Sequence, residues 1–188
     1  ELLLHQNALT RIENLEGCPK VQKLWLFSNK IAKLENLSAL GDLREFWVQD
    51  NKITKLAGLE NVSSLQILAV AANRLSDFKD LQKLAVLPNL RDLSLDDAHF
   101  GSCPIARSDG YWSFVLCYLK QIRRLDGIEI DAHDRSQAED AYMAQVLRFN
   151  DRVAGIQREH QRELLAIETR QRRSASHADV MKQELLDA

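Results

Sequence analysis

The sequence contains few of the residues that mark several large classes of protein. Seven glycines and three prolines occur in 188 residues, and none forms the glycine-rich loop that cradles nucleotide phosphates. The cysteines, Cys18, Cys103 and Cys117, are odd in number and share no metal-ligand spacing, which favours reduced cytosolic thiols over a disulfide framework. No apolar run reaches the roughly 18 residues of a membrane-spanning helix, and the apolar start, Leu2 to Leu4, is too short for a signal peptide. These absences predict a cytoplasmic protein that does not enter a membrane.

An excess of charge of one sign is also lacking. The 25 basic and 27 acidic side chains leave a formal net charge of -2, so nucleic acid is not an expected partner. A nucleophile elbow and a paired-histidine helix motif are both missing. His99 with Cys103 and Cys117 is the one grouping that offers a nucleophile and a base, but Cys117 is expected on the inward face of a helix beside Val115 and Leu116. The sequence therefore predicts a protein that is not an enzyme and has no metal, cofactor or small-molecule substrate.

What the sequence does contain is a repeat. Asn7, Asn29, Asn51 and Asn73 follow one another at intervals of 22 residues, each within the same apolar frame. The frame recurs as Leu24, Leu26, Ile31, Leu34, Leu37 and Leu40, then as Phe46, Val48, Ile53, Leu56, Leu59 and Val62, and then as Leu68, Val70, Leu75, Phe78, Leu81 and Leu84. Such self-similarity predicts a solenoid of stacked short strands, closed behind by 3₁₀ or α turns, in which the asparagine amides satisfy the turning backbone. Five parallel strands are expected, centred near Leu4, Leu26, Val48, Val70 and Leu95.

The regular repeat ends after the fourth asparagine. A fifth unit arrives after three extra residues and has Ala98 where the asparagine is due. Because the sequence begins inside a repeat and without methionine, we expect it to be a segment of a longer polypeptide.

The 22-residue unit resembles the leucine-rich repeats of the phosphatase-one regulatory subunit, tubulin cofactor E and the axonemal dynein light chain. The segment GYWSFVLCYLKQIRRLDGIEI, residues 110–130, resembles the cap that ends this subclass, in which a helix led by Tyr111 precedes a last strand and Leu-Asp-Gly, here residues 125–127. The resemblance implies an α/β leucine-rich-repeat solenoid over residues 1–130, with a parallel concave sheet, convex 3₁₀ or α turns and a capping helix over 112–120. Tyr111 and Trp112 are expected to be buried against the last repeats.

The sequence after the cap narrows the resemblance. Together with the Cys103-Pro104 turn, the stretch AYMAQVLRFNDRVAGIQREHQRELLAIE resembles the axoneme-associated leucine-rich repeat-containing protein nine family, and a nexin-dynein regulatory complex subunit is the alternative. The resemblance implies a location in the ciliary or flagellar axoneme.

Residues 131–188 are predicted to form a long helical extension, broken near 174–178. Asp134 and Gln137 offer a capping pair for its start, and the helix should reach at least residue 168. Its apolar residues form one seam: Tyr142, Val146, Phe149, Val153, Ile156, Leu164 and Ile167. The first two are expected to lie on the last repeat. The tail beyond about residue 156 is expected to project and to bind another chain.

The concave face supplies the predicted binding site, because side chains alternate along a strand and those between the core leucines must point outward. Trp25, Phe27 and Trp47 are predicted to form an exposed aromatic patch, and aromatic residues are common interface anchors. The patch and its surroundings comprise Trp25, Phe27 and Trp47, the flanking Lys23, Glu45 and Asp50, and an acidic rim of Asp92, Asp96 and Asp97. Two alternatives remain open: the rings stack on each other or lie under an upstream repeat, and the aspartates hold a cation instead of lining a binding rim.

These observations predict a non-catalytic protein–protein interaction scaffold of the axoneme, which binds one partner on the concave sheet and another through the C-terminal helix. The expected partners are axonemal or microtubule-associated proteins. The alternative is a regulatory subunit that docks a protein phosphatase or another enzyme on the concave face.

Overall fold

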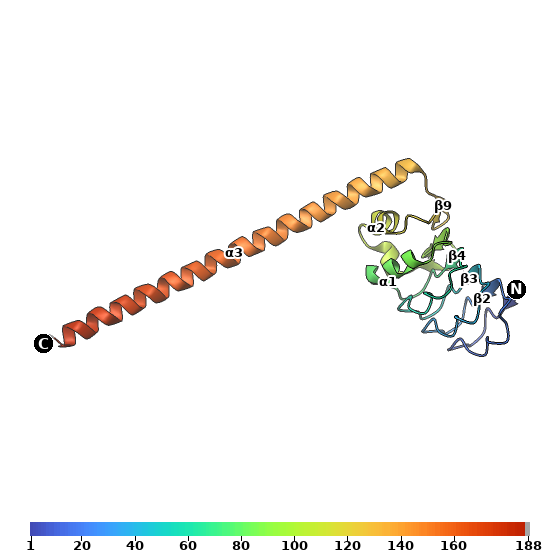
Figure 1. The fold of residues 1–188 in the computed structure, drawn as a ribbon, viewed down its shortest axis with the longest axis horizontal. Coiled ribbons are helices and arrows are strands. Elements are labelled where there is room, and N and C mark those ends of the chain that lie inside the picture. The colour runs from blue at the N-terminus through green and yellow to red at the C-terminus, as the bar shows by residue number, and fades with distance from the viewer. Residues whose placement is uncertain (187–188) are drawn as a thin grey trace. The chain divides into compact units, whose positions relative to one another are not determined.

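The repeat sequence forms a solenoid, and a long helix follows it in the chain (Figure 1). The computed structural model describes residues 1–186 and the side chains of residues 1–173. It contains two compact units: Glu1–Tyr142, here called the repeat unit, and Met143–Ala188, here called the helix unit. The repeat unit extends beyond residue 130, the predicted boundary, because the first turns of the last helix pack on the cap.

A mainly parallel sheet forms one face of the repeat unit. Its strands, in spatial order, are β1 (Leu2–Leu3), β2 (Lys23–Trp25), β3 (Glu45–Trp47), β4 (Ile67–Ala69), β5 (Asp92–Ser94), β8 (Arg124–Leu125) and β9 (Ile128–Glu129). Only β9 runs antiparallel to its neighbour. A separate hairpin consists of β6 (Asp96–Asp97) and β7 (Gly101–Ser102). The middle residues of β2, β3 and β4 are Leu24, Phe46 and Leu68, which are fully buried. The predicted leucine-rich-repeat solenoid is therefore confirmed.

The strands end earlier than the repeat pattern predicted. They are centred near Leu24 and its equivalents, two residues before Leu26. Hydrogen bonding to the next repeat continues past the strand, since the Leu26 N–H donates to the Trp47 carbonyl at 2.7 Å and the Ser28 N–H donates to the Gln49 carbonyl at 2.9 Å. The chain turns at Ser28, whose φ is 54°. The equivalent residues of the other repeats share this left-handed conformation: Gln6, Asp50 and Ala72. Each strand is short because a left-handed turn follows it at once.

The asparagines form the ladder that the repeat predicted. Asn51 is 8% exposed, and its Oδ1 accepts a hydrogen bond from the Ile31 N–H at 2.9 Å. Its Nδ2 donates to three carbonyl oxygens at 3.0 Å, those of Leu26, Val48 and Gln49. Asn29 and Asn73 make the equivalent sets of bonds. Each asparagine therefore joins its own turn to the preceding repeat.

A cysteine takes the asparagine's place in the fifth repeat. Ala98, which aligns with the asparagines in the sequence, lies exposed at the tip of the β6–β7 hairpin. Cys103 follows the hairpin, is fully buried, and donates from Sγ to the Val70 carbonyl at 3.2 Å. One repeat earlier, Asn73 makes the equivalent bond to Val48. The ladder therefore continues one step beyond the point where the sequence pattern ends.

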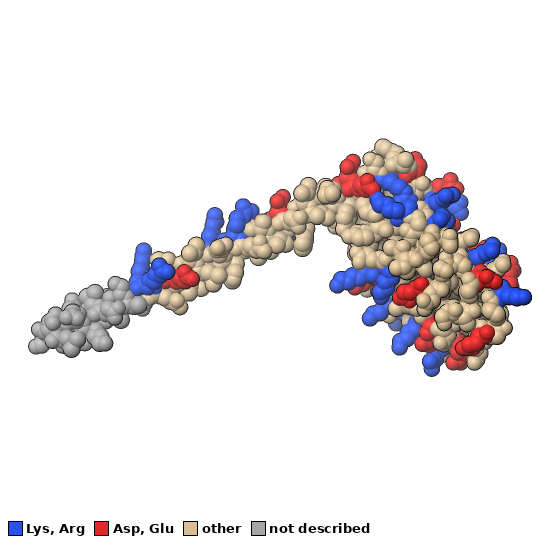
Figure 2. Space-filling view, viewed as in Figure 1, with Lys and Arg blue, Asp and Glu red and all other residues tan. Residues whose placement is uncertain are grey.

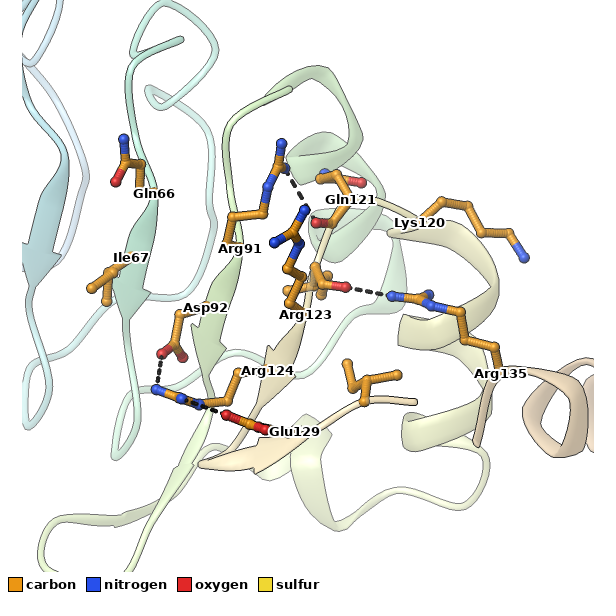
Figure 3. A pocket seen from close by; sticks show the side chains of 12 residues that line it. Gln66, Ile67, Arg91, Asp92, Lys120, Gln121, Arg123, Arg124, Glu129 and Arg135 are labelled. Carbon is orange, nitrogen blue, oxygen red and sulfur yellow. Dashed lines mark hydrogen bonds and ion pairs between the residues drawn. The ribbon is translucent and has the colours of Figure 1, made fainter. Parts of the chain in front are cut away.

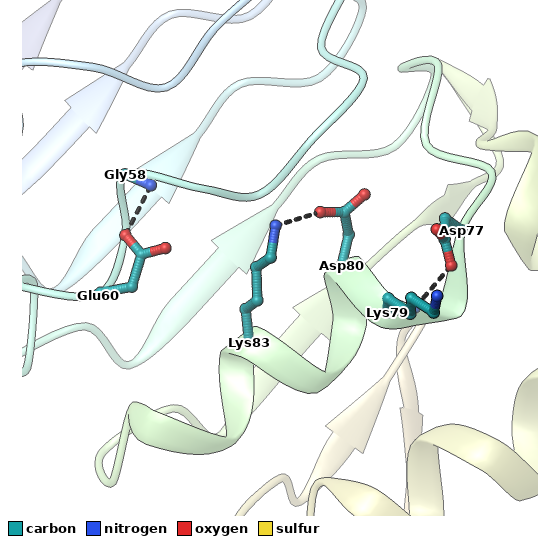
Figure 4. Close-up of polar contacts among 6 residues, drawn as sticks. All are labelled: Gly58, Glu60, Asp77, Lys79, Asp80 and Lys83. Atoms are coloured by element: carbon teal, nitrogen blue, oxygen red, sulfur yellow. Dashed lines mark hydrogen bonds and ion pairs between the residues drawn. The ribbon is translucent and has the colours of Figure 1, made fainter.

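A second column of left-handed residues lies on the far side of the solenoid. It consists of Asn14, Asn36 and Gly58, with φ values of 61°, 60° and 103°. The N–H of Gly58 donates to Glu60 Oε2 at 2.6 Å (Figure 4). A Cβ atom at Gly58 would lie 1.9 Å from the carbonyl oxygen of Leu34. Glycine is required here by both the backbone conformation and the close approach of the neighbouring repeat.

We expect Gly58→Ala to lower the free energy of unfolding by at least about 2 kcal/mol, because the methyl group forces apart two backbones in a strained conformation. Urea denaturation followed by circular dichroism measures the change. Gly41→Ala is the matched control, since a Cβ there meets no atom within 4 Å. Equal stabilities of the two variants would contradict the close contact between the repeats.

The extra residues of the fourth repeat build a helix in place of the usual turn. It comprises α1 (Phe78–Gln82) and a 3₁₀ turn, η1 (Lys83–Val86). Asp77 caps the helix, since its Oδ1 accepts from the Lys79 N–H at 2.8 Å (Figure 4). Asp80 is 6% exposed and is neutralised by Lys83, whose Nζ lies 2.7 Å away. The longer repeat thereby keeps its apolar frame while the next strand remains in register.

The cap contains helix α2 (Tyr111–Tyr118), close to the predicted 112–120. Tyr111 is buried and Trp112 half-buried. The Tyr142 hydroxyl lies 2.9 Å from that of Tyr118, with the rings perpendicular and their centroids 5.8 Å apart. The predicted packing of Tyr142 on the capped end is therefore confirmed. Packing of Val146 stays a prediction.

The C-terminal helix, α3 (Ala132–Leu186), starts at a different cap from the one predicted. The Asp131 and Asp134 side chains each accept the other's backbone N–H, at 2.8 and 3.0 Å, and Gln137 does not cap the helix. The backbone N–H of Asp134 lowers the pKa of Asp131. The helix is continuous through 174–178, where a break was predicted. Serine and histidine lower helix propensity there, but neither proline nor glycine interrupts the backbone bonds.

Candidate functional site

Two columns of side chains cross the concave face of the sheet. The strand register places one column side by side: Leu3, Trp25, Trp47, Ala69 and Ser94. The second column lies two residues further along each strand: His5, Phe27, Gln49, Ala71 and Asp96. The first repeats therefore present large aromatic groups, whereas the fourth presents two alanines.

Trp25, Phe27 and Trp47 form one cluster with His5, here called the aromatic cluster. The ring centroids of Trp25 lie 6.1 Å from those of both Trp47 and Phe27. His5 stacks on Phe27 at 4.4 Å, with an interplanar angle of 6°. All four side chains are half-buried, so the prediction of an exposed patch is wrong in degree. The rings cover one another because adjacent strands are only about 4.8 Å apart.

Phe100 is a member of this surface that the sequence did not indicate. It lies at the tip of the β6–β7 hairpin, 5.5 Å from Phe27 between ring centroids. Asp97 shapes the tip, because its Oδ1 accepts from the N–H groups of His99 and Phe100 at 2.8 and 3.1 Å. The hairpin thus brings a residue of the fifth repeat against the second repeat and covers part of the aromatic cluster.

Three polar atoms on this face are buried without a hydrogen-bond partner in the described part of the chain: His5 Nδ1, Trp25 Nε1 and Gln49 Oε1. Gln49 is only 2% exposed. In contrast, Trp47 Nε1 is 3.4 Å from Glu45 Oε2. A buried polar group without a partner costs about 1–3 kcal/mol. This face therefore contains three buried polar groups whose hydrogen-bonding capacity is unsatisfied.

A hollow of about 460 Å³ lies between the aromatic cluster and the cap. Trp47 and Gln49 form one wall, and Asp92, Asp96 and Asp126 lie on the opposite side. Its floor includes Ala69, which is 2% exposed. Small side chains in the fourth repeat therefore create the space beside the bulky ones.

The residues that flank the cluster have different roles. Lys23 lies 3.0 Å from Glu45 and 3.7 Å from Glu1, and its contact with Glu45 raises the pKa of Lys23. Asp50 is exposed and occupies the left-handed turn before Asn51. Lys23 and Glu45 thus border the cluster, whereas Asp50 belongs to the turn.

The predicted acidic rim is largely engaged within the chain. Asp92 pairs with Arg124 at 3.2 Å, although burial raises the pKa of Asp92. Asp96 Oδ1 accepts from the Ser102 hydroxyl at 2.6 Å, and Asp97 holds the hairpin tip. The sequence pattern missed the partners of Asp96 and Asp97 because the hairpin has no counterpart in the other repeats, and it missed Arg124 because that residue lies in the cap.

Asp126 ties the cap to the last regular strand. Its Oδ1 accepts from the N–H groups of Leu95 and Asp96 at 2.7 and 2.9 Å. Its Oδ2 accepts from the Tyr111 hydroxyl at 2.8 Å. The Leu-Asp-Gly signal in the sequence therefore marks a structural residue at the edge of the hollow.

The cysteines serve packing. Burial raises the pKa of Cys103 to about 11, so its thiol stays protonated near neutral pH and completes the ladder. Cys117 is half-buried rather than fully inward-facing, and its Sγ lies 3.6 Å from the Ala138 carbonyl. Within the described residues, no group of three or more metal-binding side chains comes together.

The helix unit carries the predicted seam. Phe149, Ile156, Leu164 and Ile167 are 65%, 60%, 48% and 53% exposed, and Val153 is half-buried. The seam residues form a stripe of apolar surface on a mainly polar helix. Leu165, 58% exposed, faces away from this stripe, because 3.6 residues make one turn of the helix.

Charge is distributed without a dominant sign. Basic and acidic side chains alternate over the face of the repeat unit shown in Figure 2. Within the described part of the chain, no helix is both long and apolar enough to cross a membrane.

Comparisons with known proteins agree with this architecture. Residues 1–150 match the leucine-rich-repeat family. A chain of the Drosophila melanogaster SNF/U2A' complex is similar in structure, with a TM-score of 0.66 and 27% sequence identity, over 73% of this chain and 78% of that one. Internalin C2 from Listeria monocytogenes gives a TM-score of 0.48 and 26% identity, over 62% of this chain and 46% of that one.

Proposed function

Because the chain belongs to the leucine-rich-repeat family, we propose that it is a non-catalytic scaffold that binds a partner protein on its concave face. The observation that carries the proposal is the aromatic cluster, in which half-buried rings stand beside unsatisfied polar atoms and an open hollow. Aromatic anchors next to a hollow are typical of protein interfaces. The SNF/U2A' chain supports the proposal, since a solenoid of similar fold occurs there in a complex.

The hollow defines the chemistry of the partner. An apolar side chain fits over Ala69 and against Trp47, because both present carbon to the space. A hydrogen-bond donor beside it would reach the carboxylate of Asp96, which is exposed on the opposite side of the hollow. The partner therefore presents an apolar residue flanked by a donor, such as a basic or amide side chain.

The helix unit supplies a second surface. The exposed seam of Phe149, Ile156, Leu164 and Ile167 has the spacing of residues that pack against another helix. A helix of such polarity gains little stability from propensity alone, and a docked face would stabilise it. The scaffold would thus join two partners.

We place this scaffold in the ciliary or flagellar axoneme, within the cytoplasm. The support is the resemblance of the Cys103-Pro104 turn and of the stretch that starts at Ala141 to the axoneme-associated leucine-rich repeat-containing protein nine family. Axonemal or microtubule-associated proteins are the proposed partners.

Affinity purification from a ciliated-cell extract, with the full 188-residue chain as bait, tests the proposal. We expect dynein or microtubule-associated components to be recovered. A bait with Phe149→Glu and Ile156→Glu should lose the helix partner while it retains the concave-face partner. Recovery of a phosphatase catalytic subunit in place of axonemal proteins would contradict the axonemal assignment and support the regulatory-subunit alternative.

A further inference from the structure

A second cleft lies at the edge of the sheet, beside the N-terminal ends of the last strands. It has a volume of about 880 Å³ and is lined by five basic side chains: Arg91, Lys120, Arg123, Arg124 and Arg135 (Figure 3). Its acidic side chains are Asp92 and Glu129. This composition contrasts with the nearly balanced charge of the whole chain.

The five basic and two acidic side chains leave the lining with a formal charge of +3. Asp92 and Glu129 both pair with Arg124, at 3.2 Å and 3.0 Å. Lys120 is paired outside the cleft lining, with Glu139. Arg91, Arg123 and Arg135 form no ion pair with a carboxylate among the described residues.

Two of these three arginines are held in place by backbone carbonyls. Arg91 donates from Nη1 to the carbonyls of Pro88 at 2.8 Å and Gln121 at 3.2 Å. Arg135 donates to the carbonyls of Leu116, at 3.2 Å, and Ile122. A carbonyl oxygen satisfies a hydrogen-bond donor but leaves its full charge in place. The cleft is therefore a rigid positive site.

Arg123 is the third arginine that lacks an ion pair within the part of the chain that the structure describes. Its guanidinium is exposed and has no side-chain hydrogen bond or ion pair among the described residues. The backbone N–H of Arg123 donates to the Arg91 carbonyl at 2.7 Å. Arg91 immediately precedes β5 and Arg123 immediately precedes β8, so the two arginines lie side by side at the ends of neighbouring strands. Arg44, exposed, holds the equivalent position before β3. Gln66 lies between Arg44 and Arg91 in this column, so Arg91 and Arg123 are its adjacent basic pair.

We propose that this cleft binds an acidic peptide segment of a partner protein through its carboxylates. Arg91 and Arg123 precede neighbouring strands, which are about 4.8 Å apart, whereas Lys120 follows α2 and Arg135 lies in α3. Cations that come from separate elements suit several single charges better than one phosphate. Nucleic acid is disfavoured as the occupant, because the whole chain carries a formal net charge of -2 and lacks an excess of basic groups. Ile67 and Ile130 also line the cleft, so an apolar residue between the acidic residues of the peptide can pack against them.

The proposal rests on the proposed role of the chain as a protein-binding scaffold, and it names a partner chemistry distinct from that of the aromatic cluster. The two are separable, because Arg123 is not part of the aromatic cluster or of the hollow beside it.

Fluorescence anisotropy with a labelled oligoglutamate peptide and the full chain tests the inference. We expect saturable binding that weakens with salt, and a loss of affinity of about tenfold for Arg123→Glu. Lys55→Glu is the charge-matched control, since Lys55 is exposed and lies away from the cleft, and it should change the affinity little.

Three outcomes would overturn the inference: no binding, equal binding by the Arg123→Glu variant, or an equal loss in the Lys55→Glu variant. A phosphoserine peptide that binds through Arg123 more tightly than oligoglutamate would overturn the assignment to carboxylates. A variant with Trp25→Ala and Trp47→Ala should keep its affinity for oligoglutamate. Failure of the peptide to bind, with partner binding through the aromatic cluster intact, would reject the cleft alone.

Discussion

Replacement of Asn51 by alanine should lower the free energy of unfolding by about 4 kcal/mol. The substitution leaves the buried Ile31 N–H without its acceptor, which lies 2.9 Å away in the native ladder. It also removes the donor shared by the carbonyls of Leu26, Val48 and Gln49. Because these groups belong to two repeats, the loss should loosen their stacking. Equilibrium urea denaturation measures the change.

Asn7 offers a matched control within the same ladder. Asn7 is exposed, and its amide donates to the carbonyls of Leu4 and His5. Water can therefore replace the amide as the donor to these carbonyls. Asn7→Ala should therefore cost less than about 1 kcal/mol. If Asn51→Ala were no more damaging than Asn7→Ala, the ladder would not be what holds the repeats together.

The combined substitutions Trp25→Ala and Trp47→Ala should weaken binding of the concave-face partner by about 3 kcal/mol, or roughly 150-fold. The two rings are neighbours at 6.1 Å, so their effects should not add simply. Isothermal titration calorimetry with the partner recovered by affinity purification measures the loss.

The double variant should stay folded, because the indoles pack on each other and on Phe27 outside the leucine core. Thermal unfolding monitored by circular dichroism checks this point. Val86→Ala removes a side chain that is 59% exposed on η1 and should leave binding unchanged. Unchanged binding in the tryptophan variant would show that the aromatic cluster is not an anchor.

The regular part of the fold follows directly from the sequence period. The spacing of Asn29, Asn51 and Asn73 determines where each turn lies, and the apolar frame determines which side chains enter the core. Alternation along a strand is enough to place Trp25 beside Trp47. These features are predictable because each repeat meets only its neighbours and all neighbours are alike.

The irregular part could not be predicted in this way. The β6–β7 hairpin has no counterpart in earlier repeats, so neither the contact of Phe100 with Phe27 nor the role of Asp97 is visible in the pattern. The same insertion moves the ladder position from Ala98 to Cys103. The predicted exposure of Trp25, Phe27 and Trp47 was wrong for a similar reason, because the stacked rings cover one another and the hairpin covers part of the sheet.

The concave face is the proposed binding surface for the partner. Leu3 is 53% exposed and pairs with Trp25 across β1 and β2, so a photoreactive phenylalanine analogue placed there borders the aromatic cluster without removing it. Photo-crosslinking in a ciliated-cell extract should join position 3 to one partner protein, whereas the same analogue at Val86 should not. Crosslinking of that partner from position 86 and not from position 3 would contradict the claim.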